Sequence, residues 1–128
     1  MDLRTENDEI NSDDEHYDRS LAHEAQRVVD EIKFGVDKAE VSKVLENSES
    51  LAYINLKTKE QESYCVELSI NGYMIVSRKY DTIDNELRDK HLRNVLRFET
   101  VEALMHQISP LFVKKFNDSV VEKLKQIA

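Results

Sequence analysis

The chain has 128 residues, of which 40% are hydrophobic and 34% are charged, a length and composition that suit one compact domain with a modest core. Its formal net charge of -8 argues against a nucleic-acid partner, because proteins that bind phosphate backbones usually carry a concentrated basic surface. No apolar run approaches the roughly 20 residues that cross a bilayer, and the acidic start differs from a secretory signal. No membrane association is expected.

Negative charge is concentrated at the beginning of the chain. Residues 1–19 hold eight acidic and two basic side chains, a net charge of -6, and only four apolar side chains. So few apolar groups cannot offset the conformational entropy that is lost when a segment becomes ordered. We therefore predict a disordered acidic tail over residues 1–19 and a folded domain over residues 20–128.

The first predicted element is an amphipathic helix. From Leu21 to Ala39, apolar side chains recur at three- and four-residue spacing, and Ser20 can cap the start. One face of this helix is expected to be buried. Gly35 costs roughly 1 kcal/mol relative to alanine in a helix, so fraying is expected there. A short extended segment is expected around residues 41–45.

Two segments of alternating polarity predict strands over residues 51–58 and 63–70. Each is expected to be half-buried, with one face toward the core. The dipeptide Asn71-Gly72 favours a type I′ hairpin turn, because both residues tolerate positive φ, and a third strand is predicted over residues 73–80. The two faces of the second strand are expected to hold Tyr64, Val66, Leu68 and Ile70 on the buried side, with Cys65, Glu67 and Ser69 opposite.

The rest of the chain is predicted to be largely helical. Residues 81–97 are polar and mixed, which suggests a long loop with a helical turn or two, whereas apolar spacing predicts a helix over residues 101–108. Ser109 and Pro110 are typical of the cap and first position of a final helix that runs almost to Ala128. Because the strand connections are short, we predict an α+β fold: an antiparallel meander of three to four strands, with an N-terminal helix and two C-terminal helices packed on it.

The sequence contains no recognisable catalytic, metal-binding or nucleotide-binding pattern. Its four histidines are widely separated, and neither of its two glycines begins a phosphate-binding loop. The single cysteine, Cys65, lies in an alternating strand without an adjacent base, which favours a buried structural thiol over a nucleophile. We expect a protein that is not an enzyme and has no cofactor. A lone cysteine also suits a reducing compartment, so the expected location is the cytoplasm, with the nucleus as the alternative.

The last predicted helix carries a continuous apolar stripe. Periodicity alone favours packing of this stripe on the sheet, because amphipathic terminal helices usually dock on their own domain. The helix has no C-terminal capping residue, however, and this favours an end that projects and offers its apolar face to a groove in a partner. The stripe and its neighbour comprise Val113, Phe116, Val120, Leu124 and Ile127, with Val121 beside them.

Two segments carry a family resemblance. AYINLKTKEQESYCVELSINGYMIV, from Ala52 to Val76, and ETVEALMHQISPLFVKKF, from Glu99 to Phe116, resemble the glycogen synthase kinase-3 beta interaction protein family, whose domain also occurs in clustered mitochondria proteins. The resemblance covers the chain from about Leu21 onward. It implies a non-catalytic adaptor in the regulation of Wnt signalling, whose C-terminal helix binds glycogen synthase kinase-3 as a similar helix of the scaffold axin does.

The resemblance also assigns kinase-binding positions, which follow the spacing i, i+4, i+5, i+8 and i+11 of the axin helix. All five positions are apolar here, and Lys123 matches a basic residue of the family helix, whereas Lys125 stands where the family often has glutamate. Leu124 is expected to be the central anchor. The implied kinase-binding residues are Phe116, Val120, Val121, Leu124, Ile127 and Lys123.

A second implied partner is the regulatory subunit of cyclic-AMP-dependent protein kinase. Vertebrate members of the family are similar to A-kinase anchoring proteins, and these family members engage the regulatory subunit through their own first helix. In this chain Lys33, Gly35 and Glu40 depart from the anchoring pattern, and a charge inside an apolar groove is costly unless it is paired. The positions that retain the apolar character are Val28, Val29, Ile32 and Val36.

Two other function classes compete with the adaptor. One is a purely structural interaction module, in which the C-terminal stripe is buried in the domain's own core. The other is an enzyme, which would require a cleft that gathers His91 or His106 with acidic side chains. Accessibility of the stripe in the folded chain distinguishes the adaptor from the structural module.

Overall fold

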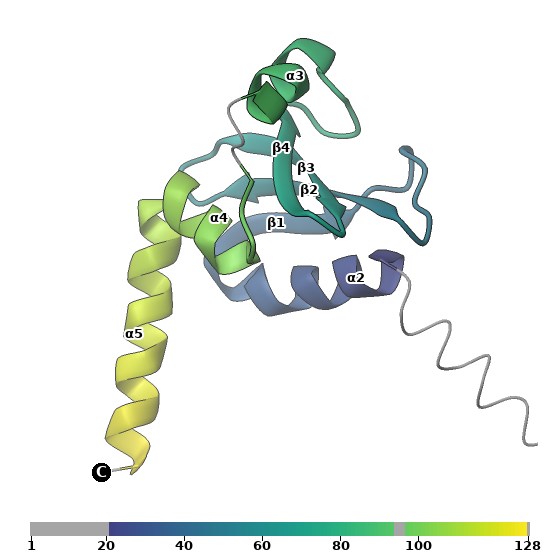
Figure 1. The fold of residues 1–128 in the computed structure, drawn as a ribbon. Helices are drawn as coiled ribbons and strands as arrows, with labels where there is room; N and C mark the ends of the chain where they lie inside the picture. Colours follow the sequence, from purple (N-terminus) through teal and green to yellow (C-terminus); the bar gives the residue numbers. More distant parts are fainter. Residues whose placement is uncertain (1–20, 94–96, 128) are drawn as a thin grey trace, which may run out of the picture.

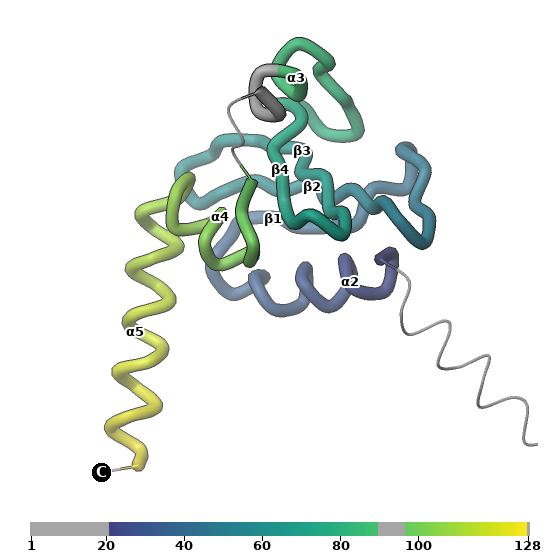
Figure 2. Tube along the Cα trace, viewed as in Figure 1, coloured from purple at the N-terminus to yellow at the C-terminus, as the bar shows by residue number. Residues whose placement is uncertain are grey.

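The computed structural model describes residues 21–93 and 97–127. The predicted tail over residues 1–19 lies outside these ranges. The described chain forms an α+β domain in which a four-stranded sheet is accompanied by an N-terminal helix and C-terminal helices, as predicted (Figures 1 and 2). In chain order the elements are α2 (Leu21–Ile32), the 3-10 turn η1 (Lys33–Gly35), β1 (Val36–Val41), β2 (Leu51–Thr58), β3 (Ser63–Ser69), β4 (Gly72–Ser77), α3 (Asn85–Arg93), α4 (Val101–Ile108) and α5 (Pro110–Ile127).

The sheet is an antiparallel meander in the order β1-β2-β3-β4. Its first strand corrects the predicted helix, which ends at Ile32 instead of continuing to Ala39. The apolar spacing of the sequence fits both structures, but as a strand residues 38–41 pair continuously with β2, and Val36 pairs with Thr58 beyond an irregularity in the register. Gly35 ends the turn η1, which joins α2 to β1, and a Cβ atom at this position would lie 2.5 Å from the Phe112 ring.

The hairpin between β3 and β4 is shifted by one residue from the prediction. Ser69 pairs with Gly72, so Ile70 and Asn71 form the turn, and Gly72 alone in this hairpin has positive φ, at 115°. Glycine is needed at position 72 for a second reason, since an added Cβ would lie 2.5 Å from the carbonyl oxygen of Phe98. Ile70 therefore lies at the tip of the turn with 91% of its surface exposed and does not join the core.

Strands β2, β3 and β4 are buried on both faces, which corrects the expectation of half-buried strands, whereas β1 keeps Lys38 and Glu40 exposed. Helices α2 and α4 cover the face that carries Ile54, Val66 and Ile75. The opposite face has its own small core of Tyr53, Cys65, Met74 and Val76, against which Leu45, Leu51 and Ile83 pack.

A buried charged group holds α3 against this second face. The buried carboxylate of Glu67 accepts a hydrogen bond from the Tyr53 hydroxyl, at 3.0 Å, and pairs with the Arg88 guanidinium of α3, at 3.2 Å. Burial and the Glu67 carboxylate together raise the pKa of Tyr53 to about 12, so its hydroxyl remains a donor at neutral pH. Residues 81–97, predicted as a loop with a helical turn or two, thus contain a helix of 9 residues that covers a charged cluster.

Candidate functional site

The base of α5 is fixed by a capping arrangement that joins two distant parts of the sequence. Ser109 caps the helix as predicted, because its hydroxyl oxygen accepts a hydrogen bond from the Phe112 N–H at 3.0 Å. The carboxylate of Glu60, in the turn between β2 and β3, accepts a hydrogen bond from the Ser109 hydroxyl and another from the Leu111 N–H, both at 2.8 Å. A negative charge at this position also stabilises the positive end of the helix dipole.

Aromatic packing completes the attachment of α5. The side chain of Phe112 is buried, with its ring centre 5.2 Å from that of Phe34 and 6.4 Å from that of Phe116. Phe116 in turn lies edge-on to His106 of α4, at 6.0 Å. Because Phe112 also occupies the space that a side chain at Gly35 would need, the first turns of α5 are packed firmly between η1 and α4.

Beyond this base, α5 projects away from the domain (Figure 1). Within the described part of the helix, no residue from Asn117 to Ile127 is buried. The apolar side chains of the predicted stripe are exposed to an extent that increases outward: Val120 40%, Val121 49%, Leu124 59% and Ile127 80%. Phe116 is half-buried at the base, and Lys123 is exposed. The structure therefore brings all six predicted kinase-binding residues together on one helix and contradicts the alternative in which the domain's own core buries the stripe.

The projecting part of α5 has little support of its own. A helix of this length without packing is marginally stable in water, because most helical stability in proteins comes from burial of an apolar face. The support that α5 does have lies near its base, where the Lys114 ammonium pairs with the Asp118 carboxylate at 3.1 Å. An exposed apolar face on a marginal helix is stabilised when a partner surface covers it.

Comparison with known proteins identifies the family of the chain. The sequence model of the GSKIP domain matches residues 21–127. The chain belongs to the GSKIP domain family. It is 31% identical to the GSK3-beta interaction protein of Gallus gallus, over 96% of this chain and 88% of the relative. It is also 31% identical to the GSK3B-interacting protein of Homo sapiens (85% of this chain, 74% of the relative) and 38% identical to Protein GSKIP homolog of Drosophila melanogaster (73% and 75%).

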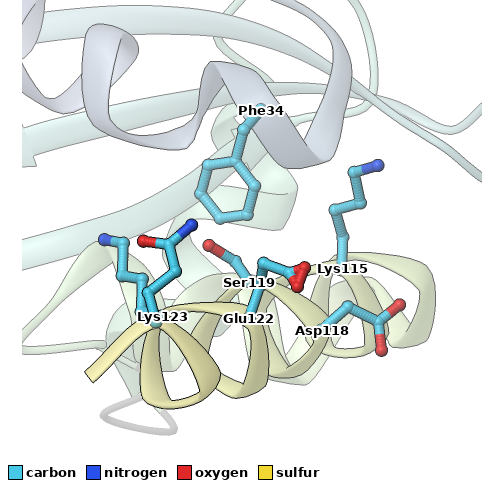
Figure 3. A pocket seen from close by; sticks show the side chains of 7 residues that line it. Phe34, Lys115, Asp118, Ser119, Glu122 and Lys123 are labelled. Atoms are coloured by element: carbon cyan, nitrogen blue, oxygen red, sulfur yellow. The ribbon is translucent and has the colours of Figure 1, made fainter. Parts of the chain in front are cut away.

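A hollow of about 550 Å³ lies beside α5 in this GSKIP domain (Figure 3). Phe34, which is 42% exposed, points from η1 toward the helix across this hollow. This feature could not be predicted from the sequence, because Phe34 and α5 are more than 75 residues apart. The mixed charges around the hollow differ from the mainly apolar lining of a small-molecule site. Its lining residues on α5 are Lys115, Asp118, Ser119, Glu122, Lys123 and Gln126.

The residues predicted to anchor the regulatory subunit lie elsewhere in the GSKIP domain. Val28, Val29 and Ile32 are on the face of α2 that packs on the sheet, and Val36 is the first residue of β1 and does not belong to the helix. All four side chains belong to the main core and are at most 5% exposed. A partner could reach them only if α2 left the sheet, because their contact surface is already used within the domain.

The structure bears out the prediction that Cys65 is a structural thiol. Cys65 is fully buried, and burial raises the pKa of its thiol to about 11, so it is a protonated core group at neutral pH. Across residues 21–93 and 97–127, no group of three histidine, cysteine or acidic side chains is placed to hold a metal ion. Among the described helices, none has the length and apolar character of a membrane span.

Glu60 gives the base of α5 a measurable pH dependence. Partial burial favours the protonated form of Glu60, but the hydrogen bonds from Leu111 and Ser109 outweigh this and hold the pKa of its carboxyl below the ordinary value of 4.5. The stabilisation is therefore present above the unfolded-state pKa and is lost as pH falls through the folded-state pKa.

We expect Glu60→Gln to be less stable than the wild type at neutral pH, with a difference that shrinks as the pH falls below about 4.5. Urea unfolding of both proteins at a series of pH values measures this difference. A difference that is constant across the acidic range would show that the charge of Glu60 is not responsible.

Proposed function

We propose that this chain is a non-catalytic adaptor that binds glycogen synthase kinase-3 through the exposed apolar stripe of α5. Relatives with this domain are named for an interaction with GSK3-beta. The observation that carries the proposal is the exposure of the stripe, because Val120, Leu124 and Ile127 remain between 40% and 80% exposed and lie together on one face of the helix. A helix of this kind suits an apolar groove in a partner.

The residues of the stripe occupy different positions relative to the proposed partner. Phe116 is half-buried against the domain, so it would lie where the partner meets the base of the helix. Leu124 stands two turns farther out and is the central anchor, with Val120 before it and Ile127 beyond it. Lys123 offers a charge at the edge of the stripe, where charges mainly affect orientation and the association rate. Val121 extends the apolar face to one side.

The adaptor would keep the kinase in place, or inhibit it, without chemistry of its own. We place it in the cytoplasm and in Wnt signalling, following the family resemblance. Binding of the regulatory subunit of cyclic-AMP-dependent protein kinase is not part of the proposal, because Val28, Val29 and Ile32 are core residues.

A peptide of residues 109–128 tests whether α5 is sufficient. We expect it to compete with the full chain for purified kinase, with an affinity reduced by the cost of ordering the free peptide into a helix. The matched control is the same peptide with Leu124→Asp. Absence of competition, at concentrations where the full chain is bound, would mean that α5 is not the binding element.

A further inference from the structure

One edge of the sheet is open. At the opposite edge, Tyr73 of β4 exchanges two backbone hydrogen bonds with Phe98, at 2.8 and 3.0 Å. Strand β1 has β2 on one side, and among the described residues no segment pairs with its other side. A hollow of about 400 Å³ lies there, lined by Lys33 and residues 36–40. Such an edge is a template for another strand, because it presents a row of unpaired backbone donors and acceptors.

The register of β1 shows which backbone groups face outward. The Ser42 N–H donates to the Tyr53 carbonyl oxygen at 2.8 Å, and the same register continues to Lys38, beyond which the ladder is irregular. Backbone groups in an antiparallel pair alternate in direction, so Lys38 and Glu40 direct theirs toward β2. Ala39 and Val41 therefore direct their N–H and C=O groups to the open edge.

Two of the three charged side chains of this strand, those of Lys38 and Glu40, lie on one face of the sheet. The Lys38 ammonium is 5.9 Å from the centre of the Tyr80 ring, and the carboxylate of Glu40 acts on the same tyrosine by its charge. Both side chains are exposed, and no ion pair engages either of them within the described part of the chain. A second strand beside β1 would bring its own side chains next to these two charges.

We infer that β1 pairs with β1 of a second copy of this chain, antiparallel, with Ala39 facing Ala39 across a two-fold axis. In this register the outward backbone groups of the two Ala39 residues bond to each other. Lys38 of each copy then lies opposite Glu40 of the other, which gives two favourable cross-strand pairs. The same surface serves both copies, as the interface of a two-fold dimer requires.

Neighbouring registers are unfavourable, so the sequence of β1 specifies this one. A shift by one position pairs an outward-facing residue with an inward-facing one and removes the hydrogen bonds. A shift by two positions places Lys38 opposite Lys38, or Glu40 opposite Glu40, and like charges directly opposite each other destabilise a pair of strands.

The helix layer is compatible with this pairing. Neighbouring strands lie about 4.8 Å apart, and α2 packs over both β1 and β2. The two copies of α2 in the dimer would therefore lie roughly 10 Å apart. This distance is near the upper end of the usual range for packed helices. Gln26 of α2 and Lys33 of η1 line the hollow between α2 and β1 at this edge. A polar helix contact of this kind suits a reversible dimer rather than an obligate one.

Charge exchange tests the pairing directly. In analytical ultracentrifugation of the full chain, we expect the wild type to self-associate with rising concentration, and Lys38→Glu or Glu40→Lys alone to weaken association by about tenfold or more. An equimolar mixture of these two variants is expected to associate as the wild type does, because each supplies the charges that the other lacks. Lys125→Glu, an exposed change of the same charge on α5, is the control and is expected to behave as the wild type.

Three outcomes would overturn the inference. The first is a wild type that stays monomeric at millimolar concentration, and the second is self-association that both single variants retain. The third concerns hydrogen exchange: protection of the Ala39 and Val41 amides that does not depend on concentration would mean that another part of the same chain covers the edge. Protection that appears only with self-association supports the dimer.

Discussion

Replacing Leu124 by aspartate is expected to weaken binding of the full chain to glycogen synthase kinase-3 by about thirtyfold or more, which corresponds to about 2 kcal/mol. The side chain is 59% exposed in the free protein and has apolar neighbours on both sides along the helix, so a partner groove would bury it completely. Aspartate at that position would place an unpaired charge in an apolar environment.

The fold of this variant should be unaffected, because Leu124 makes no contribution to the core. Ile70→Asp is the matched control, since it places the same charge at another exposed apolar residue, 91% exposed and far from α5 in the sequence. Titration calorimetry measures the affinity of each variant for the kinase and shows whether the loss is specific to position 124. Equal loss of affinity in both, or in neither, would remove Leu124 from the binding surface.

Phe112→Ala is expected to have the largest effect on stability, a loss of about 3–5 kcal/mol in the free energy of unfolding. The ring is 1% exposed and fills the space between Phe34, Gly35 and Phe116, so its removal leaves a cavity at the point where α5 joins the domain. A loss of this size is a large fraction of the stability of a typical small domain.

Leu111→Ala is the control for this prediction. Leu111 is next to Phe112 in the sequence, but its side chain is 46% exposed, and the hydrogen bond from its backbone N–H to Glu60 is retained in the variant. Chemical denaturation measures the two losses, and limited proteolysis reports whether α5 is released. A loss below about 1 kcal/mol for Phe112→Ala would mean that the base of α5 is not part of the cooperative core.

The strands were predictable where alternation and local turns decide the structure, as in β2 and β3. The end of α2 was not, because the apolar residues from Val36 to Ala39 satisfy helical spacing as well as a strand, and only pairing with the distant β2 distinguishes the two. The sequence also did not predict that the second face of the sheet is buried. Alternation in the sequence places Glu67 on the face of β3 opposite the predicted core, but in the structure Glu67 is buried and pairs with Tyr53 and Arg88.

The candidate site, like the fold, was predictable from the sequence only in part. Periodicity predicted the stripe from Phe116 to Ile127, since the identity of an apolar helix face depends on residues three and four apart. Periodicity cannot show what covers such a face, and so the sequence left open whether the domain buries it. Exposure of the stripe follows from the base of α5, where Glu60, 49 residues before Ser109, directs the helix outward.

Hydrogen exchange of the full chain, with and without purified glycogen synthase kinase-3, measures the binding surface directly. The marginal helix beyond Phe116 should exchange rapidly in the free protein and become protected in the complex over residues 117–127, while α2 is unchanged. Kinase binding that leaves the exchange of residues 117–127 unaltered, or that protects α2 instead, would contradict the account.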